Sequence, residues 1–231
     1  MYREAFILKI FEIDSPLMRT LGKVSDLVIL NLLTVLMCIP IVTAGASFTA
    51  MHYCCLKIMR GHENKISKQF FHSFKDNLRQ STVIWLIFLL ILAFFGGDLY
   101  LMYLNPSETS TFIFGGIIAA LALLFFAGTM VFPLQAKFYN PIPKTIKMAF
   151  LFSFRHFPQT LLVMLATLFP FSLFLIGNLG ILLFPLILCF CFSAPGFLSA
   201  KFYDKDFAAA EEAIMAKNQQ STEPTEDGSE T

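Results

Sequence analysis

Charged residues are scarce in this 231-residue sequence, where Asp, Glu, Lys and Arg make up only 14%. A soluble domain carries about 25%. Apolar residues reach 56%, and Phe alone contributes 28. Such a chain cannot cover a water-facing surface of ordinary polarity, which excludes both a soluble domain and a disordered, solvated chain. The net charge of +1 gives no support for a nucleic-acid-binding surface. The composition therefore predicts an integral membrane protein.

Motifs of enzymes and metal proteins are also lacking. The sequence has no Ser-His-Asp arrangement on one face, no glycine-rich phosphate loop, no His-Glu-x-x-His and no paired carboxylates within a span. No cysteine stands at ligand spacing with a histidine, so we interpret all five as small apolar residues of the spans: Cys38, Cys54, Cys55, Cys189 and Cys191. We expect no catalytic activity, no cofactor and no metal ion.

Long uncharged stretches predict the membrane spans. The hydrocarbon core is about 30 Å thick and a helix rises about 1.5 Å per residue, so a span needs about 20 mostly apolar residues. The stretches that meet this requirement are 81–104, 111–136, 158–177 and 180–200. They predict an all-α fold, a polytopic membrane helical bundle.

The uncharged region from Leu27 to Leu56 is long for one span and short for two. Pro40 ends its first helix, because proline lacks the amide donor and disfavours helix at the residue before it. We therefore predict a hairpin of two short spans, 24–42 and 44–59, and a re-entrant element is the open alternative. With this hairpin the bundle has about six transmembrane helices.

Basic residues indicate the orientation. All 17 Lys and Arg residues lie near the N-terminus, within 57–79, within 137–155 or in the C-terminal tail. An out-and-back hairpin at 24–59 places all of these segments on one side of the membrane, and the opposite turns carry none. By the positive-inside rule this side is cytoplasmic, so a multi-pass protein with both termini in the cytoplasm is predicted.

The chain is predicted to have three parts. Residues 1–23 form an N-terminal interfacial amphipathic segment, in which apolar residues recur at helical spacing over 3–13. Residues 24–200 form the transmembrane helical domain. Residues 201–231 form a cytoplasmic tail whose polar, acidic end is predicted to be disordered, so its truncation should be tolerated.

An internal repeat connects the later spans. Residues 70–75 (Phe-x-x-Ser-Phe-Lys) align with 150–155 (Phe-x-x-Ser-Phe-Arg), each just before a span. Residues 136–139 (Ala-Lys-Phe-Tyr) align with 200–203, each just after one. We interpret this as a duplicated unit, an inner amphipathic segment followed by a two-helix hairpin, with the hairpin at 24–59 as a diverged third copy.

The inner amphipathic segments combine aromatic and basic residues. Phe70, Phe71 and Phe74 can enter the headgroup region while Lys75 and its basic neighbours meet phosphate or an acidic protein. One interpretation is a membrane-surface connector. The other is a docking face for a cytoplasmic or membrane partner.

Polar side chains in the first hairpin need partners, because burying them in hydrocarbon is costly. Asn31 is predicted to bond across the hairpin to Thr43, Ser47 or Thr49, with small residues around Gly45 allowing close helix approach. The alternative interpretation is a solute path.

The candidate solute path uses the carboxylates within the predicted spans. Asp26 lies near the inner end of the first span, Asn31 lies deeper, and Asp98 lies near the outer surface. Intramembrane polar residues of this kind mark ion or substrate paths in transporters.

Residues 15–85 carry a more specific pattern, spread over the first hairpin and the basic segment after it. Its elements are Pro16-Leu17-x-Arg19, Asp26-Leu27, Leu30-Asn31-Leu32-Leu33, Pro40-Ile41-Val42-Thr43-Ala44-Gly45-Ala46, Thr49-Ala50, Leu56-Lys57, Arg60-Gly61, Phe70-Phe71, Phe74-Lys75 and Asn77-x-x-Gln80. This pattern resembles the YesL family of bacterial integral membrane proteins of unknown function. The rest of the chain is similar to that family only in hydropathy.

Members of that family are typically encoded beside carbohydrate ABC transporters and polysaccharide-degrading enzymes in Gram-positive bacteria. The resemblance therefore implies a bacterial cell membrane, a role in carbohydrate uptake and ABC permease subunits as partners. We expect a non-enzymatic accessory subunit; the alternatives are a stand-alone small-solute transporter and a membrane scaffold or sensor. Structural or partner contacts are expected at Asp26, Asn31, Pro40, Thr43, Gly45, Phe74 and Lys75.

Overall fold

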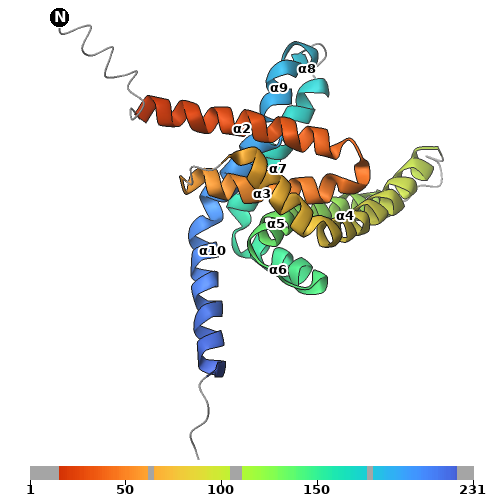
Figure 1. Ribbon diagram of the computed structural model, residues 1–231. Helices are drawn as coiled ribbons and strands as arrows, with labels where there is room; N and C mark the ends of the chain where they lie inside the picture. Colours follow the sequence, from red (N-terminus) through yellow and green to blue (C-terminus); the bar gives the residue numbers. More distant parts are fainter. Residues whose placement is uncertain (1–15, 62–64, 105–110, 176–178, 223–231) are drawn as a thin grey trace, which may run out of the picture.

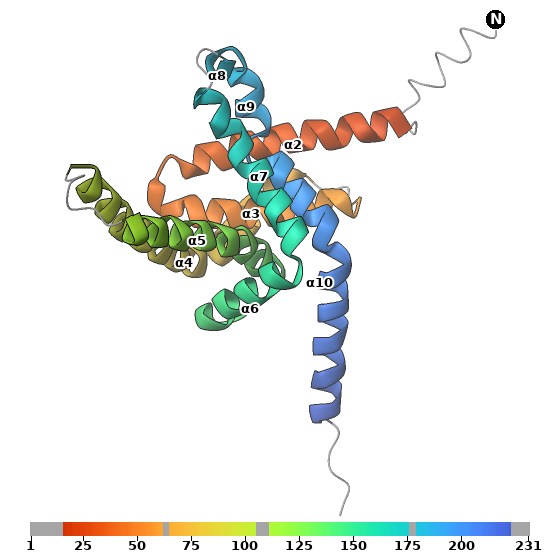
Figure 2. The same ribbon diagram turned by 180° about the vertical axis from the view of Figure 1, so that it is seen from behind.

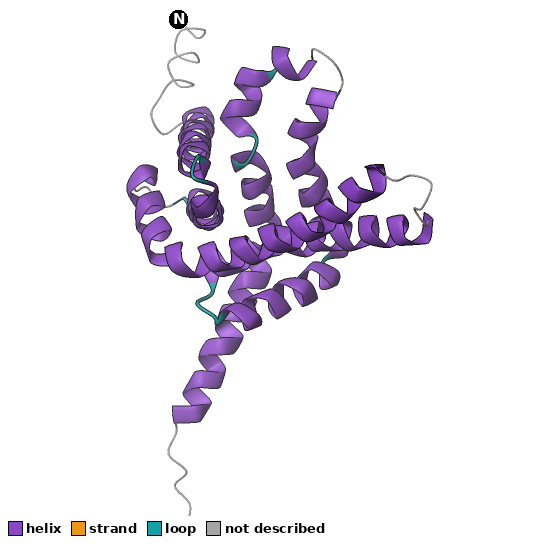
Figure 3. Ribbon diagram, turned by 90° about the vertical axis from the view of Figure 1, so that its right-hand side faces the viewer, coloured by secondary structure: helices purple, strands orange, loops and turns teal. Residues whose placement is uncertain are grey.

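The computed structural model describes residues 16–61, 65–104, 111–175 and 179–222. No strand occurs within these ranges, and the chain is built of helices joined by short loops (Figure 3). This confirms the predicted all-α bundle. The elements are α2 (Pro16–Cys38), η1 (Ile41–Thr43), α3 (Ala44–Met59), α4 (Ile66–Leu104), α5 (Thr111–Lys137), α6 (Ile142–Arg155), α7 (Phe157–Ser172), η3 (Leu173–Leu175), α8 (Leu179–Leu182), α9 (Phe184–Phe190) and α10 (Ser193–Thr222). The predicted interfacial residues 3–13 lie outside the described ranges.

The helices form three hairpins around α3. The first hairpin is α2 with α3, the second is α4 with α5, and the third is α7 with the return through α8, α9 and α10 (Figures 1 and 2). Helix α3 packs against α2, α4, α5 and α10, and most of its side chains are buried. The shortest of the predicted spans is therefore the centre of the core.

The number of helices long enough to cross a membrane differs from the predicted six. Within the described residues, four segments are long and apolar enough to cross a membrane: Leu17–Cys38, Ile66–Leu104, Thr111–Lys137 and Phe184–Ala213. The bent pair α6 and α7 makes a fifth if it is counted as one span. Helix α3 has 16 residues, about 24 Å at 1.5 Å per residue, and is too short for this count. A re-entrant first hairpin therefore remains an alternative to a hairpin that crosses the membrane twice.

The two copies of the repeat diverge at the entry to the span. In the first copy the amphipathic segment continues directly into the span as the 39-residue helix α4. In the second copy the chain bends by 105° between α6 and α7. Pro158 stands in the first turn of α7 and prevents a continuous helix, whereas the matching position of α4 is Leu78. Only the second copy therefore has a separate amphipathic helix.

The burial of Phe70 also differs from the sequence prediction. Its ring is fully buried in the protein core instead of entering the headgroup region, while Phe71 is exposed. The reason is that α4 turns the Phe70 face toward α3, so this aromatic residue anchors the segment to the bundle.

Helix boundaries at both ends of the transmembrane region are shifted. Helix α2 begins at Pro16, within the predicted interfacial segment, and α10 runs without a break through the predicted boundary at 200. Beyond that boundary, Tyr203 and Phe207 are fully buried, and the Tyr203 hydroxyl lies 3.0 Å from that of Thr160 on α7. The start of the predicted tail therefore belongs to the folded bundle, although α10 extends well below the other helices (Figure 1).

Acidic residues of α10 meet one basic residue from each hairpin. Arg60, after α3, pairs with Asp204 at 2.6 Å. Lys137, at the end of α5, pairs with Glu211 at 2.5 Å, and His156, between α6 and α7, lies 3.8 Å from Asp206. The ends of the hairpins that carry basic residues therefore converge on one helix.

Candidate functional site

Asn31 joins α2 to the break between α9 and α10. Its Oδ1 accepts hydrogen bonds from the backbone N–H groups of Phe192 at 2.9 Å and Ser193 at 2.8 Å. Its Nδ2 donates to the Leu188 carbonyl at 2.7 Å and contacts the Cys191 Sγ at 3.6 Å. Asn31 is fully buried.

These bonds replace the ones that the helix break removes. Backbone groups at a helix end have no partner within the helix, and in a membrane they cannot turn to water. One amide side chain supplies both the acceptor and the donor that this break needs. The prediction that Asn31 bonds across the hairpin to Thr43, Ser47 or Thr49 was therefore wrong, since its partners are backbone groups about 160 residues later.

The turn of the first hairpin is held by hydroxyl groups and by the single tryptophan. Thr43 Oγ1 donates to the Met37 carbonyl at 2.8 Å and also lies 2.9 Å from the Pro40 carbonyl. Trp85 of α4 donates its indole N–H to the Ile41 carbonyl at 2.7 Å. Pro40 is exposed; it follows the end of α2, and its carbonyl also accepts a hydrogen bond from the Thr43 N–H at 2.9 Å.

Gly45 lies at a close approach of α3 to α4. A Cβ atom there would stand 2.4 Å from the Ser81 carbonyl oxygen and 2.6 Å from the Trp85 Cβ. Beside it, the hydroxyl groups of Thr49 and Ser81 lie 2.8 Å apart. The small-residue face of α3 therefore packs against α4 of the same chain, and it is not accessible to a partner protein.

The two carboxylates of the candidate solute path lie apart from these contacts. Asp26 and Asp98 are half-buried, and within the described ranges neither makes a hydrogen bond or an ion pair. Asp98 stands 13 positions after Trp85 on α4, about 20 Å along the helix. None of Asp26, Asn31 and Asp98 lines the cavity that is described below.

Phe74 and Lys75 lie on the inner part of α4. The Phe74 ring stacks on that of Phe70 with 6.2 Å between centroids and packs against the core. Lys75 is exposed together with Lys68 and Arg79, which share its face because they lie one and two turns away. None of the three forms an ion pair in the described structure. We call Lys68, Lys75 and Arg79 the basic face of α4.

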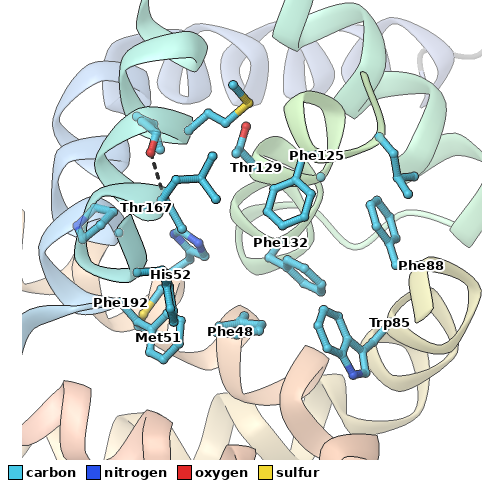
Figure 4. Close-up of a pocket in the computed structure, with 18 of the residues that line it drawn as sticks. Phe48, Met51, His52, Trp85, Phe88, Phe125, Thr129, Phe132, Thr167 and Phe192 are labelled. Carbon is cyan, nitrogen blue, oxygen red and sulfur yellow. Dashed lines mark hydrogen bonds between the residues drawn. The ribbon is translucent and has the colours of Figure 1, made fainter. Parts of the chain in front are cut away.

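A cavity of about 410 Å³ lies between α3, α4, α5, α7 and the start of α10 (Figure 4). This volume is in the range of ligand pockets, which is about 300–1,000 Å³. Its lining is almost wholly apolar, with aromatic rings from Phe48, Trp85, Phe88, Phe125 and Phe132 around it. None of the residues singled out from the sequence lines it.

The polar groups of the cavity lining are already bonded, with one exception. Thr129 donates to the Phe126 carbonyl and Thr167 to the Val163 carbonyl, each at 2.8 Å, while Trp85 donates to the Ile41 carbonyl in η1. His52 makes no hydrogen bond to any described residue. Sequence reasoning missed His52 because a lone histidine in an apolar run has no spacing signal, and only the helix packing turns it toward a cavity.

One comparison with known proteins finds a match, and it falls on the first hairpin and α4. A family model described as "Protein of unknown function, DUF624" matches residues 27–99. The match includes Asn31, Gly45, His52 and the basic face of α4, and it ends before α5. No curated protein and no solved structure matches the chain.

Proposed function

We propose that this chain is a non-enzymatic accessory subunit of a carbohydrate ABC transporter in a bacterial cell membrane, and that it meets the transporter through the basic face of α4. The observation that carries the proposal is the free charge of Lys68, Lys75 and Arg79, three exposed cations without an ion pair in the described structure. The resemblance of residues 15–85 to the YesL family supplies the class of partner.

The opposite face of the same helix explains why these charges suit a partner contact. Ile66, Phe70 and Ser73 are buried against the bundle, so the inner part of α4 is held in place. A rigid helix presents its charges without a large ordering cost on binding. An acidic surface at the inner side of a permease would complement them and favour one orientation of the two proteins.

The cavity weighs against a stand-alone sugar transporter. A sugar carries several hydroxyl groups, and each one that enters an apolar site without a partner costs about 1 to 3 kcal/mol. The lining offers His52 as its one unbonded polar side chain in the described structure. A polar solute would therefore find too few hydrogen bonds, and Asp26 and Asp98 lie outside the lining.

Co-purification from native membranes tests the proposal. The tagged full chain should recover sugar ABC permease subunits from a mild detergent extract, and the double charge reversal Lys75→Glu with Arg79→Glu should reduce the recovered permease about tenfold. The matched control is Lys144→Glu with Lys147→Glu, which reverses two exposed charges on α6.

Two outcomes would count against the proposal. Recovery of no permease subunit with the unaltered chain would remove the accessory role. An equal loss with the α4 and α6 charge reversals would mean that positive charge at the membrane surface is needed in general, and the docking face on α4 would be given up.

A further inference from the structure

The residues at the rim of the cavity indicate whether it opens to water or to the hydrocarbon of the membrane. Leu92, Phe125, Leu168 and Phe171 line the cavity, and all are also exposed on the outside of the bundle, with 39 to 48% of their surface accessible. They come from α4, α5 and α7, helices whose outer faces are apolar. In a membrane, such an opening faces hydrocarbon and not water.

An empty cavity of this kind is unfavourable. Its lining loses dispersion contacts in proportion to the volume. Water is a poor occupant, because each buried molecule needs two to four polar partners and the lining offers very few. The lining therefore favours an apolar occupant from the surrounding bilayer.

His52 specifies one polar feature of that occupant. Its ring belongs to the lining, among apolar side chains of α3, α5 and α7 (Figure 4). A neutral imidazole offers one N–H donor and one acceptor nitrogen, and a hydroxyl group can use either. A charged group would lose its hydration in such surroundings without an opposite charge to replace it.

We propose that this cavity binds a long-chain lipid of the bilayer that carries a single uncharged hydroxyl group, with the chain among the aromatic rings and the hydroxyl bonded to His52. The site is independent of the basic face of α4, so either proposal can fail without the other.

Photolabelling with two matched probes tests the proposal. The full chain is reconstituted in phosphatidylcholine nanodiscs with a long-chain fatty alcohol that carries a diazirine in mid-chain, or with the corresponding alkane. After irradiation, labelled positions are mapped by mass spectrometry. We expect labels on lining residues such as Thr129 and Met164, and about three- to tenfold more label from the alcohol than from the alkane.

Two substitutions at His52 separate the hydroxyl contact from the shape of the cavity. His52→Leu should bring the alcohol down to the level of the alkane, and His52→Gln, which keeps a donor and an acceptor, should retain the difference. An unchanged preference for the alcohol in His52→Leu would overturn the assignment of His52.

A pair of substitutions on α7 tests the cavity itself. Thr167→Trp narrows the cavity and should reduce labelling of its lining by both probes, whereas Leu165→Trp, on the exposed side of the same helix, should leave it intact. The unfolding temperature of each variant shows whether the bundle is retained, and the His52 pair decides the matter if Thr167→Trp does not fold. Labels that are spread evenly over exposed residues, with no enrichment in the lining, would overturn the proposal.

Discussion

Single residues hold this bundle together at places where the backbone is interrupted or closely packed. Asn31 supplies hydrogen bonds to a helix break on the far side of the chain, and Gly45 leaves room for a carbonyl oxygen of α4. Both roles are structural, although the sequence also left a partner contact open for the two residues and a solute path open for Asn31. Substitutions at Asn31 and Gly45 should therefore change the free energy of unfolding.

Replacing Asn31 by leucine should destabilise the bundle strongly. Asn31→Leu leaves the N–H groups of Phe192 and Ser193 and the Leu188 carbonyl without their partner. We expect a loss of about 2 to 4 kcal/mol in the free energy of unfolding, measured by SDS titration in detergent micelles.

Thr34→Val is the matched control for this substitution. Thr34 is also fully buried on α2, but its hydroxyl donates only to the Leu30 carbonyl of its own helix. Its removal should cost less than about 1 kcal/mol. Similar losses for the two variants would mean that the bonds of Asn31 to the helix break contribute little.

Adding a methyl group at Gly45 should also be destabilising. In Gly45→Ala the new Cβ would meet the backbone of Ser81 and the Cβ of Trp85 at distances that force α3 and α4 apart. We expect a loss of about 1 to 3 kcal/mol in the same unfolding assay. Gly22→Ala, where no atom lies within 4 Å, should be neutral or stabilising by up to about 1 kcal/mol. A neutral Gly45→Ala would contradict the close approach.

At the scale of elements, α10 connects the three hairpins. It begins at the break that Asn31 satisfies, buries Tyr203 and Phe207, and forms ion pairs with Arg60 of the first hairpin and Lys137 of the second. A helix that composition alone would divide into a span and a polar tail therefore acts as one structural unit.

The pair of Arg60 and Asp204 should show measurable coupling. Their side chains are 34% and 28% exposed, so the interaction is less screened by solvent than a pair on the open surface. A double-mutant cycle with Arg60→Ala and Asp204→Ala should give about 0.5 to 1 kcal/mol. The pair His72 and Asp76, at 76% and 58% exposure, should give a value near zero. Equal coupling in the two cycles would contradict the difference in environment.

Truncation should separate the structural part of α10 from the end of the chain. A chain that ends at Thr222 keeps every described contact and should retain its unfolding temperature in detergent. A chain that ends at Ala200 loses Tyr203, Phe207 and the ion pair of Asp204, and should not be recovered as a monodisperse protein. Normal behaviour of the shorter chain on size-exclusion chromatography would show that α10 is not the connecting element.

At the scale of the whole molecule, the fold is three hairpins, each of which has one end against α10 (Figure 2). Such an arrangement needs the basic connecting segments on the same side of the membrane. It also places Pro40, at the turn of the first hairpin, toward the other side if α2 and α3 cross the bilayer.

Cysteine labelling should establish this topology. In a cysteine-free background, Lys75→Cys should react with a membrane-impermeant maleimide only after the cells are permeabilised, and Pro40→Cys should react in intact cells. Both positions are exposed, so burial does not limit the reaction. Labelling of Lys75→Cys in intact cells would contradict the single-sided arrangement. Protection of Pro40→Cys would favour the re-entrant form of the first hairpin.

The amino-acid sequence was sufficient for the properties that depend on local composition. The scarcity of charge indicated a membrane protein, the uncharged stretch 111–136 coincides with α5 to within one residue, and Pro40 marked the hairpin turn. These features are local. The length of an apolar stretch decides whether it can span the hydrocarbon core, and a proline ends the helix in which it stands, both independently of distant parts of the chain.

Only the tertiary structure decided the roles that depend on distant partners. The partners of Asn31, the burial of Phe70, the function of α10 as a connector and the presence of His52 at a cavity all follow from helices that are far apart in sequence. The periodicity of apolar residues predicts which face of a helix is apolar, but it does not predict which other helix packs against that face. That choice is made by the packing of the whole bundle, and with it the location of the candidate site.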